Sequence, residues 1–485
     1  MNKLYQIVVL PIVFLAGSIN NYALAQSAVQ QRTKQVENNL TEFLQTNDSG
    51  PKNLQQRMKH YKVNGLSIAV IKNYKIDWAK AYGIADTVSK TPVTNKTLFQ
   101  VASISKSLNA VGVMKLFKSR HLDLLADINT YLTSWKFPYD SLSKGKKINT
   151  AHLLSHTAGL NVSGFGGYER GTSLPSVTQI LNGEQPANTA AVRSVFEPGL
   201  RQQYSGGGVT ITQLMLTDLS KDPYEKYMAD QVLKPMGMLN STFAQPPLGL
   251  KPGVLAAGYD VAGKEVKGKS HVYPEQAAAG LWTNPTDLAK YIIETQLAYE
   301  GRSAKVLDQP TTRLRLTPYM NADAALGVFI ENHGGLKYFG HGGANEGFRS
   351  SYYGSLEGGN GLVIMLNSDN GEIIQELINS IATVYDFKGL NKIKKIKLAD
   401  VSETDLDSYL GDYQLTPKLL LSITRQGKHI YAQATGQARL EAFPETKFKF
   451  FFKVIHATME FVKDDQGKVT KMLFTQGPTI EAKKL

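Results

Sequence analysis

The chain has 485 residues, 42% of them hydrophobic, and a formal net charge of +13 at pH 7. This length is enough to bury the cores of two domains. No cysteine is present, which excludes disulfides, thiol catalysis, cysteine-ligated zinc and a lipid anchor on cysteine. The positive charge favours anionic surfaces such as cell wall or membrane headgroups. No motif that combines basic and aromatic residues indicates binding to nucleic acid.

The first 25 residues have the pattern of a secretory signal peptide. Lys3 precedes a short apolar run over residues 7–17, and a small-residue cleavage site follows at residues 23–25. The run contains Pro11 and is shorter than the roughly 18 apolar residues of a membrane span, a length that no later run reaches. We therefore expect an exported protein, periplasmic or secreted, with no integral membrane segment after cleavage near Gln26.

The predicted elements begin with a helical segment over residues 32–60. Residues 65–86 then read as two strands around a turn at 72–75, and residues 103–120 have apolar side chains at helical spacing. Helices and glycine-rich loops are expected over residues 150–242, strands joined by turns over 334–371, and a helix over 373–385. Because strands flank a helical middle, the pattern predicts an α+β domain whose sheet is completed by both ends of the domain.

A change of composition predicts a second domain. Residues 391–400 form a basic linker, and short alternating strands such as "LLLSITRQGKHIYAQATG" follow it. We expect a signal peptide over residues 1–25, the α+β domain over 26–390, the linker over 391–400 and a small all-β domain over 401–485.

The stretch "VASISKSLNA" places Ser103, Ser105 and Lys106 close together. If a helix begins near Ser103, this serine and Lys106 share a face, and Ser105 points to the other side. Ser103 is then either a nucleophile with an amine beside it or an ordinary helix cap next to a solvated lysine.

Two later segments place glycines next to polar side chains. In "RQQYSGGGVT", Tyr204 and Ser205 precede three glycines, which suggests a phosphate cradle or a flexible loop before a helix at residues 209–219, although no phosphate-loop motif is complete. In "GHGGANEGF", His341, Gly342 and Gly343 stand at an expected strand start, where glycine lets the backbone approach a ligand closely.

The segment "HLLSHTAGL" holds His152 and His156 at a spacing that zinc sites use on a helix. The glutamate of H-E-x-x-H is missing and no third ligand is evident. We therefore expect a structural helix end and no metal or other cofactor.

Together these segments resemble the serine β-lactamase-like hydrolases, which include class C β-lactamases, penicillin-binding DD-peptidases and related esterases. Further segments of this kind are "FEPGLRQQYSGGG", "AAAGLWTNPTDLAKY" and "LKPMGMLNSTF", and the similarity covers roughly residues 35–385. The resemblance implies a catalytic domain with an antiparallel sheet flanked by a helical region. The tail, with "LDSYLGDYQL", resembles a barrel-like β domain that is often appended to these hydrolases.

The resemblance also implies roles for the residues. Ser103 would be the nucleophile, and Lys106 and Tyr204 would handle its proton, with either one as the general base. His341, Gly342 and Gly343 match the family's K-T-G strand and would bind substrate. By the same analogy, the backbone N–H groups of Ser103 and Ala344 would form the oxyanion hole.

The sequence departs from the family pattern at two positions. Gly206 stands where the tyrosine triplet usually ends in asparagine, and His341 replaces the lysine of K-T-G. A neutral imidazole cannot act as a permanent cation for a substrate carboxylate. Both changes weaken the interpretation as a β-lactamase.

Two functions follow from these features. The first is an exported serine hydrolase that cleaves an amide or ester bond of a D-amino-acid peptide, a small ester or, weakly, a β-lactam through a Ser103 acyl-enzyme. The second is a penicillin-recognising or cell-wall-fragment-binding protein with little or no turnover. The expected partner is a small-molecule or peptide substrate, such as one derived from the cell wall. The sequence does not indicate the oligomeric state.

Overall fold

The computed structural model describes residues 26–485 except residues 48–49, 250–252, 418, 454 and 456, so the predicted signal peptide lies outside the described residues. The chain divides into two compact units. Unit 1 contains the chain up to Leu40 together with Lys52–Asn391, and unit 2 contains Thr41–Pro51 together with Lys392–Leu485.

Unit 1 is built on a seven-stranded antiparallel sheet with the strand order β4-β3-β2-β10-β9-β8-β7. Its strands are β2 (Gly65–Lys72), β3 (Lys75–Asp86), β4 (Thr91–Pro92), β7 (Phe329–His333), β8 (Leu336–Asn345), β9 (Phe348–Ser355) and β10 (Gly361–Leu366). Strand β10 pairs with β2, which joins the early strands to the late ones. This confirms the prediction that both ends of the domain complete one sheet.

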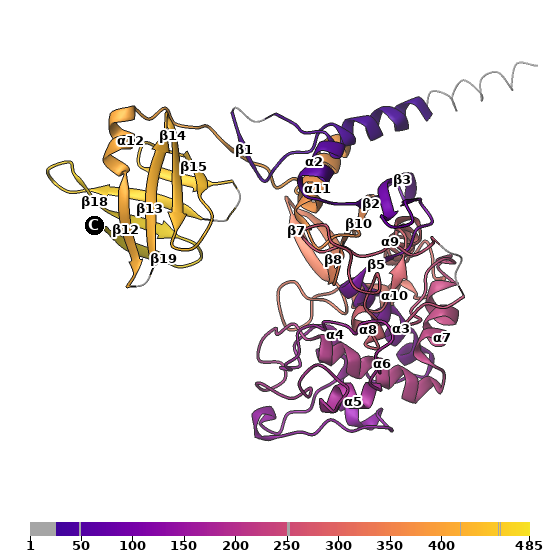
Figure 1. The fold of residues 1–485 in the computed structure, drawn as a ribbon. Helices are drawn as coiled ribbons and strands as arrows, with labels where there is room; N and C mark the ends of the chain where they lie inside the picture. The colour runs from indigo at the N-terminus through magenta and orange to yellow at the C-terminus, as the bar shows by residue number, and fades with distance from the viewer. Residues whose placement is uncertain (1–25, 48–49, 250–252, 418, 454, 456) are drawn as a thin grey trace, which may run out of the picture. The chain divides into compact units, whose positions relative to one another are not determined.

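The regular structure between β4 and β7 is almost entirely helical, and most of these helices lie together in one region of unit 1 (Figure 1). Its α-helices are α3 (Ser105–Ser119), α4 (Thr150–Leu154), α5 (Val177–Asn182), α6 (Gly206–Ser220), α7 (Tyr224–Met228), α8 (Gln276–Ala279), α9 (Pro285–Tyr299) and α10 (Gln309–Arg315). The segment also contains the 3₁₀ turns η1 (Ala102–Ile104), η2 (Ile128–Thr130) and η3 (Ser141–Ser143) and the π-helix η4 (Ala229–Leu233). Strand β5 (Phe99–Gln100) pairs with β6 (Trp282–Thr283).

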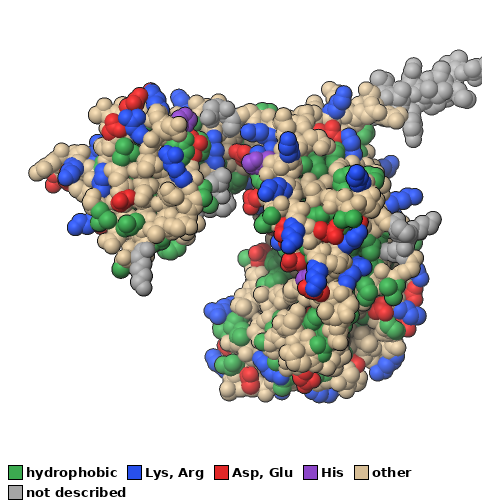
Figure 2. Space-filling model, viewed as in Figure 1, with side chains coloured by type: hydrophobic (Ala, Val, Ile, Leu, Met, Phe, Trp, Pro, Cys, Tyr) green, Lys and Arg blue, Asp and Glu red, His purple; other side chains and the backbone are tan. Residues whose placement is uncertain are grey.

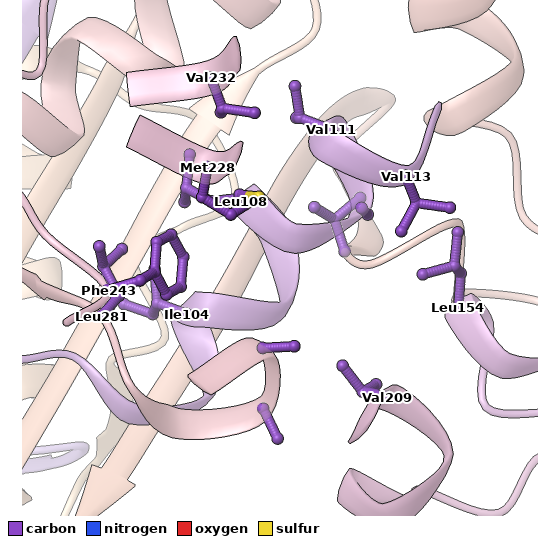
Figure 3. Close-up of a cluster of buried hydrophobic side chains, with 14 of the residues drawn as sticks. Ile104, Leu108, Val111, Val113, Leu154, Val209, Met228, Val232, Phe243 and Leu281 are labelled. Atoms are coloured by element: carbon purple, nitrogen blue, oxygen red, sulfur yellow. The ribbon is translucent and has the colours of Figure 1, made fainter. Parts of the chain in front are cut away.

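Helix α3 lies in the centre of the larger core and is buried along most of its length. Its apolar side chains meet those of neighbouring segments, as Figure 3 shows for Leu108 and Met228. A helix that is buried on nearly all sides is held rigidly by packing. The packing of α3 therefore also fixes the position of the residues directly before it, Ala102–Ile104.

A second core lies against a different set of sheet side chains and includes α2 (Leu54–His60) and α11 (Glu372–Tyr385). The helical segment predicted over residues 32–60 is only partly helical, because helix covers residues 26–37 and then α2, with none between them. Gly50 and Pro51 interrupt the segment, and Asn53 caps α2 by accepting a hydrogen bond from the Gln55 N–H (2.8 Å).

Unit 2 is a closed eight-stranded barrel that a short helix, α12 (Glu403–Tyr409), precedes. Its strands are β12 (Gly411–Thr416), β13 (Leu419–Gln426), β14 (His429–Ala434), β15 (Leu440–Pro444), β16 (Lys449–Phe452), β17 (Thr458–Lys463), β18 (Val469–Thr475) and β19 (Thr479–Lys484). Inside it, the rings of Tyr409 and Phe461 stack with centroids 4.3 Å apart. The barrel-like fold is confirmed, with a helix where strands alone were expected.

The segment predicted as a plain basic linker contains a strand. Strand β11 (Lys394–Ile396) pairs in parallel with β1 (Leu44–Thr46), which comes from the N-terminal part of the chain. A parallel pair between such distant segments has no local sequence signal, because each strand has only three residues.

The basic side chains are distributed among acidic ones over the face drawn in Figure 2. Within the described part of the chain, no helix combines the length and the apolar character needed to cross a bilayer.

Candidate active site

Ser103 lies in the turn η1, directly before α3. Lys106, on the first turn of α3, donates hydrogen bonds to Ser103 Oγ (2.9 Å) and to the Ala278 carbonyl (2.7 Å), and it is only 2% exposed. The predicted pairing of Ser103 with Lys106 is therefore present. Lys106 is not solvated, and Ser103 lies inside η1 rather than capping α3.

Ser105 has a different environment, as its spacing predicted. It is fully buried, and its hydroxyl accepts a hydrogen bond from the Leu281 N–H (2.9 Å). The α-helix begins at Ser105, two residues later than the sequence suggested, because the chain enters it through η1. Ala102 opens this turn with φ +48°, a conformation that L residues rarely adopt.

Tyr204 lies two residues before the start of α6. Ser205 is the N-cap of this helix, since its Oγ accepts a hydrogen bond from the Gly208 N–H (2.9 Å). The glycine run is the buried first turn of α6 and is neither a flexible loop nor an open phosphate cradle. The helix begins three residues earlier than predicted because Ser205 is a strong cap.

Residues His341 to Ala344 lie within β8 rather than at its start. Strand β7 pairs with β8 only as far as Gly340, which lies opposite Phe329, so β8 continues past the first residue of β7. A Cβ at Gly343 would lie 2.1 Å from the Val101 carbonyl oxygen, two residues before Ser103, whereas at Gly342 the nearest atom would be 3.8 Å away. The glycine at 343 thus lets β8 pass directly against the turn that carries the nucleophile candidate.

His341 is almost completely buried, with 8% of its surface exposed. Its Nδ1 donates to the Gly342 carbonyl (2.6 Å), and among the described residues its buried Nε2 has no hydrogen-bond partner. Burial, followed by the positive charge of Lys106, lowers the pKa of His341 to about 3. The imidazole is therefore neutral near pH 7, in agreement with the expected loss of a permanent cation.

The segment "HLLSHTAGL" does more than end a helix. His152 belongs to a capping box of α4, and its Nδ1 accepts from the Asn149 N–H (3.3 Å). His156 instead packs against Tyr204, with ring centroids 4.2 Å apart. The sequence did not predict that His156 lies beside Tyr204. Its only signal was the spacing between His152 and His156, which resembles a zinc site, and the two imidazoles have different partners.

The position of Gly206 is filled by another part of the chain. A Cβ there would lie 3.0 Å from the Phe165 ring and 3.1 Å from the Ser163 carbonyl oxygen. The loop at residues 163–165 therefore occupies the space into which a side chain at 206 would extend. The replacement of asparagine by glycine therefore removes an amide, and the loop at residues 163–165 also takes up the space that the amide would need.

A cleft of about 470 Å³ connects these parts. Ser103, Tyr204 and the β8 segment line it together with residues of the neighbouring strand β9 and of α11. The complete lining is Ser103, Tyr204, Gly342, Gly343, Ala344, Arg349, Ser350, Ser351, Tyr353, Gly371, Ile374, Gln375 and Ile378. Of these described residues, Arg349 alone is charged, and it forms an ion pair with Asp369 (2.7 Å).

The antiparallel sheet, the helical region and the Ser-Lys-Tyr cleft define the fold of β-lactamases and penicillin-binding proteins. Residues 51–380 match the family described as Beta-lactamase, and the chain belongs to this family. Residues 397–485 match a domain of unknown function, DUF3471.

Comparisons with individual proteins agree with this assignment. Protein flp of Staphylococcus aureus (strain N315) is 25% identical over 354 residues, which cover 70% of this chain and 67% of flp. Penicillin-binding protein 4* of Bacillus subtilis (strain 168) is 21% identical over 432 residues, covering 83% and 91% of the two chains. The octameric penicillin-binding protein homologue from Pyrococcus abyssi has a similar fold, with a TM-score of 0.62 at 21% identity over 89% of this chain and 98% of that one.

Proposed function

We propose that this protein is a serine hydrolase that cleaves an ester or amide bond through an acyl-enzyme on Ser103. The observation that carries the proposal is the 2.9 Å hydrogen bond between the buried Lys106 Nζ and Ser103 Oγ. A serine hydroxyl is a weak nucleophile until a neighbouring group takes its proton. A lysine enclosed beside a partly exposed serine supplies such a group.

The reaction then proceeds in two steps. Ser103 Oγ attacks the substrate carbonyl carbon while its proton passes to the pair of Lys106 and Tyr204, and that proton leaves with the alcohol or amine. Lys106 Nζ lies 5.1 Å from the centre of the Tyr204 ring, which puts this tyrosine next to the Ser103–Lys106 pair. Water next attacks the acyl-enzyme, which releases the acid and restores the Ser103 hydroxyl. The N–H groups of Ser103 and Ala344 would stabilise the oxyanion in both steps.

The charges around the nucleophile favour esters and D-amino-acid peptides over β-lactams. A β-lactam acyl-enzyme gains from a cation that holds its carboxylate, and the residue at that strand position is a neutral imidazole. The cleft also offers Tyr353, Ile374 and Ile378 as apolar contacts. An ester with an apolar group, or a peptide with an apolar side chain, fits this combination.

The alternative is a penicillin-recognising or cell-wall-fragment-binding protein that is acylated and does not turn over. The filled space at Gly206 supports it, because an amide contact that positions substrate is absent there. Steady-state hydrolysis of p-nitrophenyl acetate distinguishes the two functions, since a protein without turnover releases one equivalent of nitrophenol and then stops.

The test of the proposal compares the wild type with Ser103→Ala and Ser105→Ala. Ser103→Ala should abolish hydrolysis and the acyl mass on the active-site peptide, and Lys106→Ala should lower the rate at least about 100-fold. Ser105→Ala is the matched control: it removes the nearby hydroxyl that bonds the Leu281 N–H instead of Lys106, and it should retain most activity. Equal losses in the two serine variants would contradict the assignment of the nucleophile.

We also propose that the chain is exported, because residues 1–25 have the pattern of a signal peptide. Fractionation of a bacterium that expresses the full chain, followed by N-terminal sequencing, tests this. A product that retains residues 1–25 in the cytoplasm would contradict it.

A further inference from the structure

The backbone of His156 adopts a conformation that is uncommon for residues other than glycine. Its φ is +58°, in the left-handed region, just after the end of α4. Glycine adopts this region most easily, and a side chain there costs about 1 kcal/mol. A histidine at such a position suggests that its side chain has a task that glycine could not perform.

Three contacts connect His156 to Tyr204 and its chain neighbours. The His156 carbonyl accepts a hydrogen bond from the Gln203 N–H (2.7 Å), and the ring Nδ1 accepts one from the Ser205 N–H (3.2 Å). The imidazole also packs on the Tyr204 ring, with centroids 4.2 Å apart and planes inclined by 36°. His156 therefore holds the backbone on both sides of Tyr204 and one face of its ring.

The ring can keep these contacts because it is neutral. Burial lowers the pKa of His156 well below its ordinary value, and the nearby Lys106 and His341 lower it further. Since Nδ1 accepts the Ser205 N–H, the ring proton is on Nε2. Protonation of Nδ1 would break this hydrogen bond and add a positive charge beside Lys106.

We propose that His156 is a positioning residue that fixes Tyr204 beside Lys106 for proton transfer. His156 is 4% exposed and does not line the cleft, so it acts through Tyr204 rather than on substrate. The inference rests on the proposed acyl transfer at Ser103.

The test uses His156→Gly and His156→Asn. Glycine accepts the left-handed backbone but removes the ring and the acceptor, whereas asparagine places an acceptor near the Nδ1 position and also tolerates this backbone. The first readout is the rate at which a fluorophosphonate labels Ser103, followed by mass spectrometry. This rate reports the activated nucleophile whether or not any substrate turns over. We expect His156→Gly to lower it by about 10- to 100-fold, as for a weakened general acid–base group, and His156→Asn to restore part of it.

A double-mutant cycle with Tyr204→Phe separates positioning from a general structural effect. If His156 acts by placing the Tyr204 hydroxyl, His156→Gly should cost less than about 3-fold once that hydroxyl is absent. Rates are normalised to the folded fraction. His152→Asn is the matched control, since His152 caps the same helix without touching Tyr204, and it should label at nearly the wild-type rate.

The positioning role would be overturned if His156→Gly lowered the labelling rate by the same factor with and without the Tyr204 hydroxyl. It would also be overturned if His152→Asn lowered this rate as much as His156→Gly does. A wild type that labels at Ser103 but hydrolyses no ester would instead overturn the proposed turnover, and the labelling cycle would still decide the role of His156. A wild type that does neither overturns both.

Discussion

Replacement of Glu275 by glutamine should remove a pH-dependent penalty on the stability of unit 1. Glu275 directly precedes α8, the helix whose Ala278 carbonyl accepts from Lys106. The side chain is completely buried, and within the described structure neither carboxylate oxygen has a hydrogen-bond partner. Burial raises the pKa of Glu275 from 4.5 to about 7.

The sign of the effect follows from the two pKa values. The folded protein holds the Glu275 proton more tightly than the unfolded chain, so stability from this group is fully present below about pH 4.5. It is lost progressively as the pH rises to about 7 and does not change further above that. The gap between the two values corresponds to about 3 kcal/mol. Tyr168 and Tyr273, the titrating groups that interact with Glu275, ionise only at higher pH, because burial raises their pKa values.

The assay is urea unfolding of the wild type and of Glu275→Gln at pH 5 and pH 8. The variant should be close to the wild type at pH 5 and more stable by about 2–3 kcal/mol at pH 8, because glutamine stays neutral. Glu357→Gln, in an exposed turn, is the control for removing one carboxylate. A difference between variant and wild type that is the same at both pH values would refute the reasoning.

Three further predictions concern the site and the domains. Gly343→Ala should lower stability by about 1–3 kcal/mol and reduce ester hydrolysis strongly, whereas Gly342→Ala should be tolerated. Thermal melts and kcat/KM for p-nitrophenyl acetate measure the two effects. Equal effects of the two variants would contradict the close approach of β8 to Val101. His341→Lys should raise kcat/KM for nitrocefin relative to p-nitrophenyl acetate by about 10-fold, the value of one charge-assisted hydrogen bond; an unchanged ratio argues against a carboxylate grip at this position. A chain that ends at Asn391, with residues 41–51 replaced by a glycine-serine linker, should unfold cooperatively and keep its esterase activity, and an insoluble or non-cooperative product would contradict an independent unit 1.

The sequence predicted those features of the fold that depend on local patterns. Alternation of apolar and polar residues predicts strands, and their position on both sides of a helical segment predicts the joined sheet. The pairing of Ser103 with Lys106 was predictable for the same reason, since one helical turn brings them together. Where a turn of different geometry intervened, as at η1, the pairing survived although the start of the helix was misplaced.

The features that were missed depend on contacts between distant parts of the chain. No local pattern indicates that the His156 ring reaches Tyr204, that loop 163–165 fills the space at Gly206, or that β1 pairs with β11. The left-handed backbone of His156 is equally hidden, because the sequence shows histidine where a glycine would have signalled it. A long-range contact is decided by the packing of whole elements, which short motifs do not encode.

The two departures from the family pattern have one physical consequence. At Gly206 a polar amide is replaced by a glycine covered by Phe165, and at His341 a cation is replaced by a buried, neutral imidazole. His156 adds a second neutral ring beside Tyr204. A protonated ring here would share its surroundings with the ammonium of Lys106, and that repulsion helps to keep both imidazoles uncharged. Positions 206, 341 and 156 therefore add no charge beside Ser103, and the charge of Arg349, which lies across from Ala344 on the neighbouring strand, is paired with Asp369.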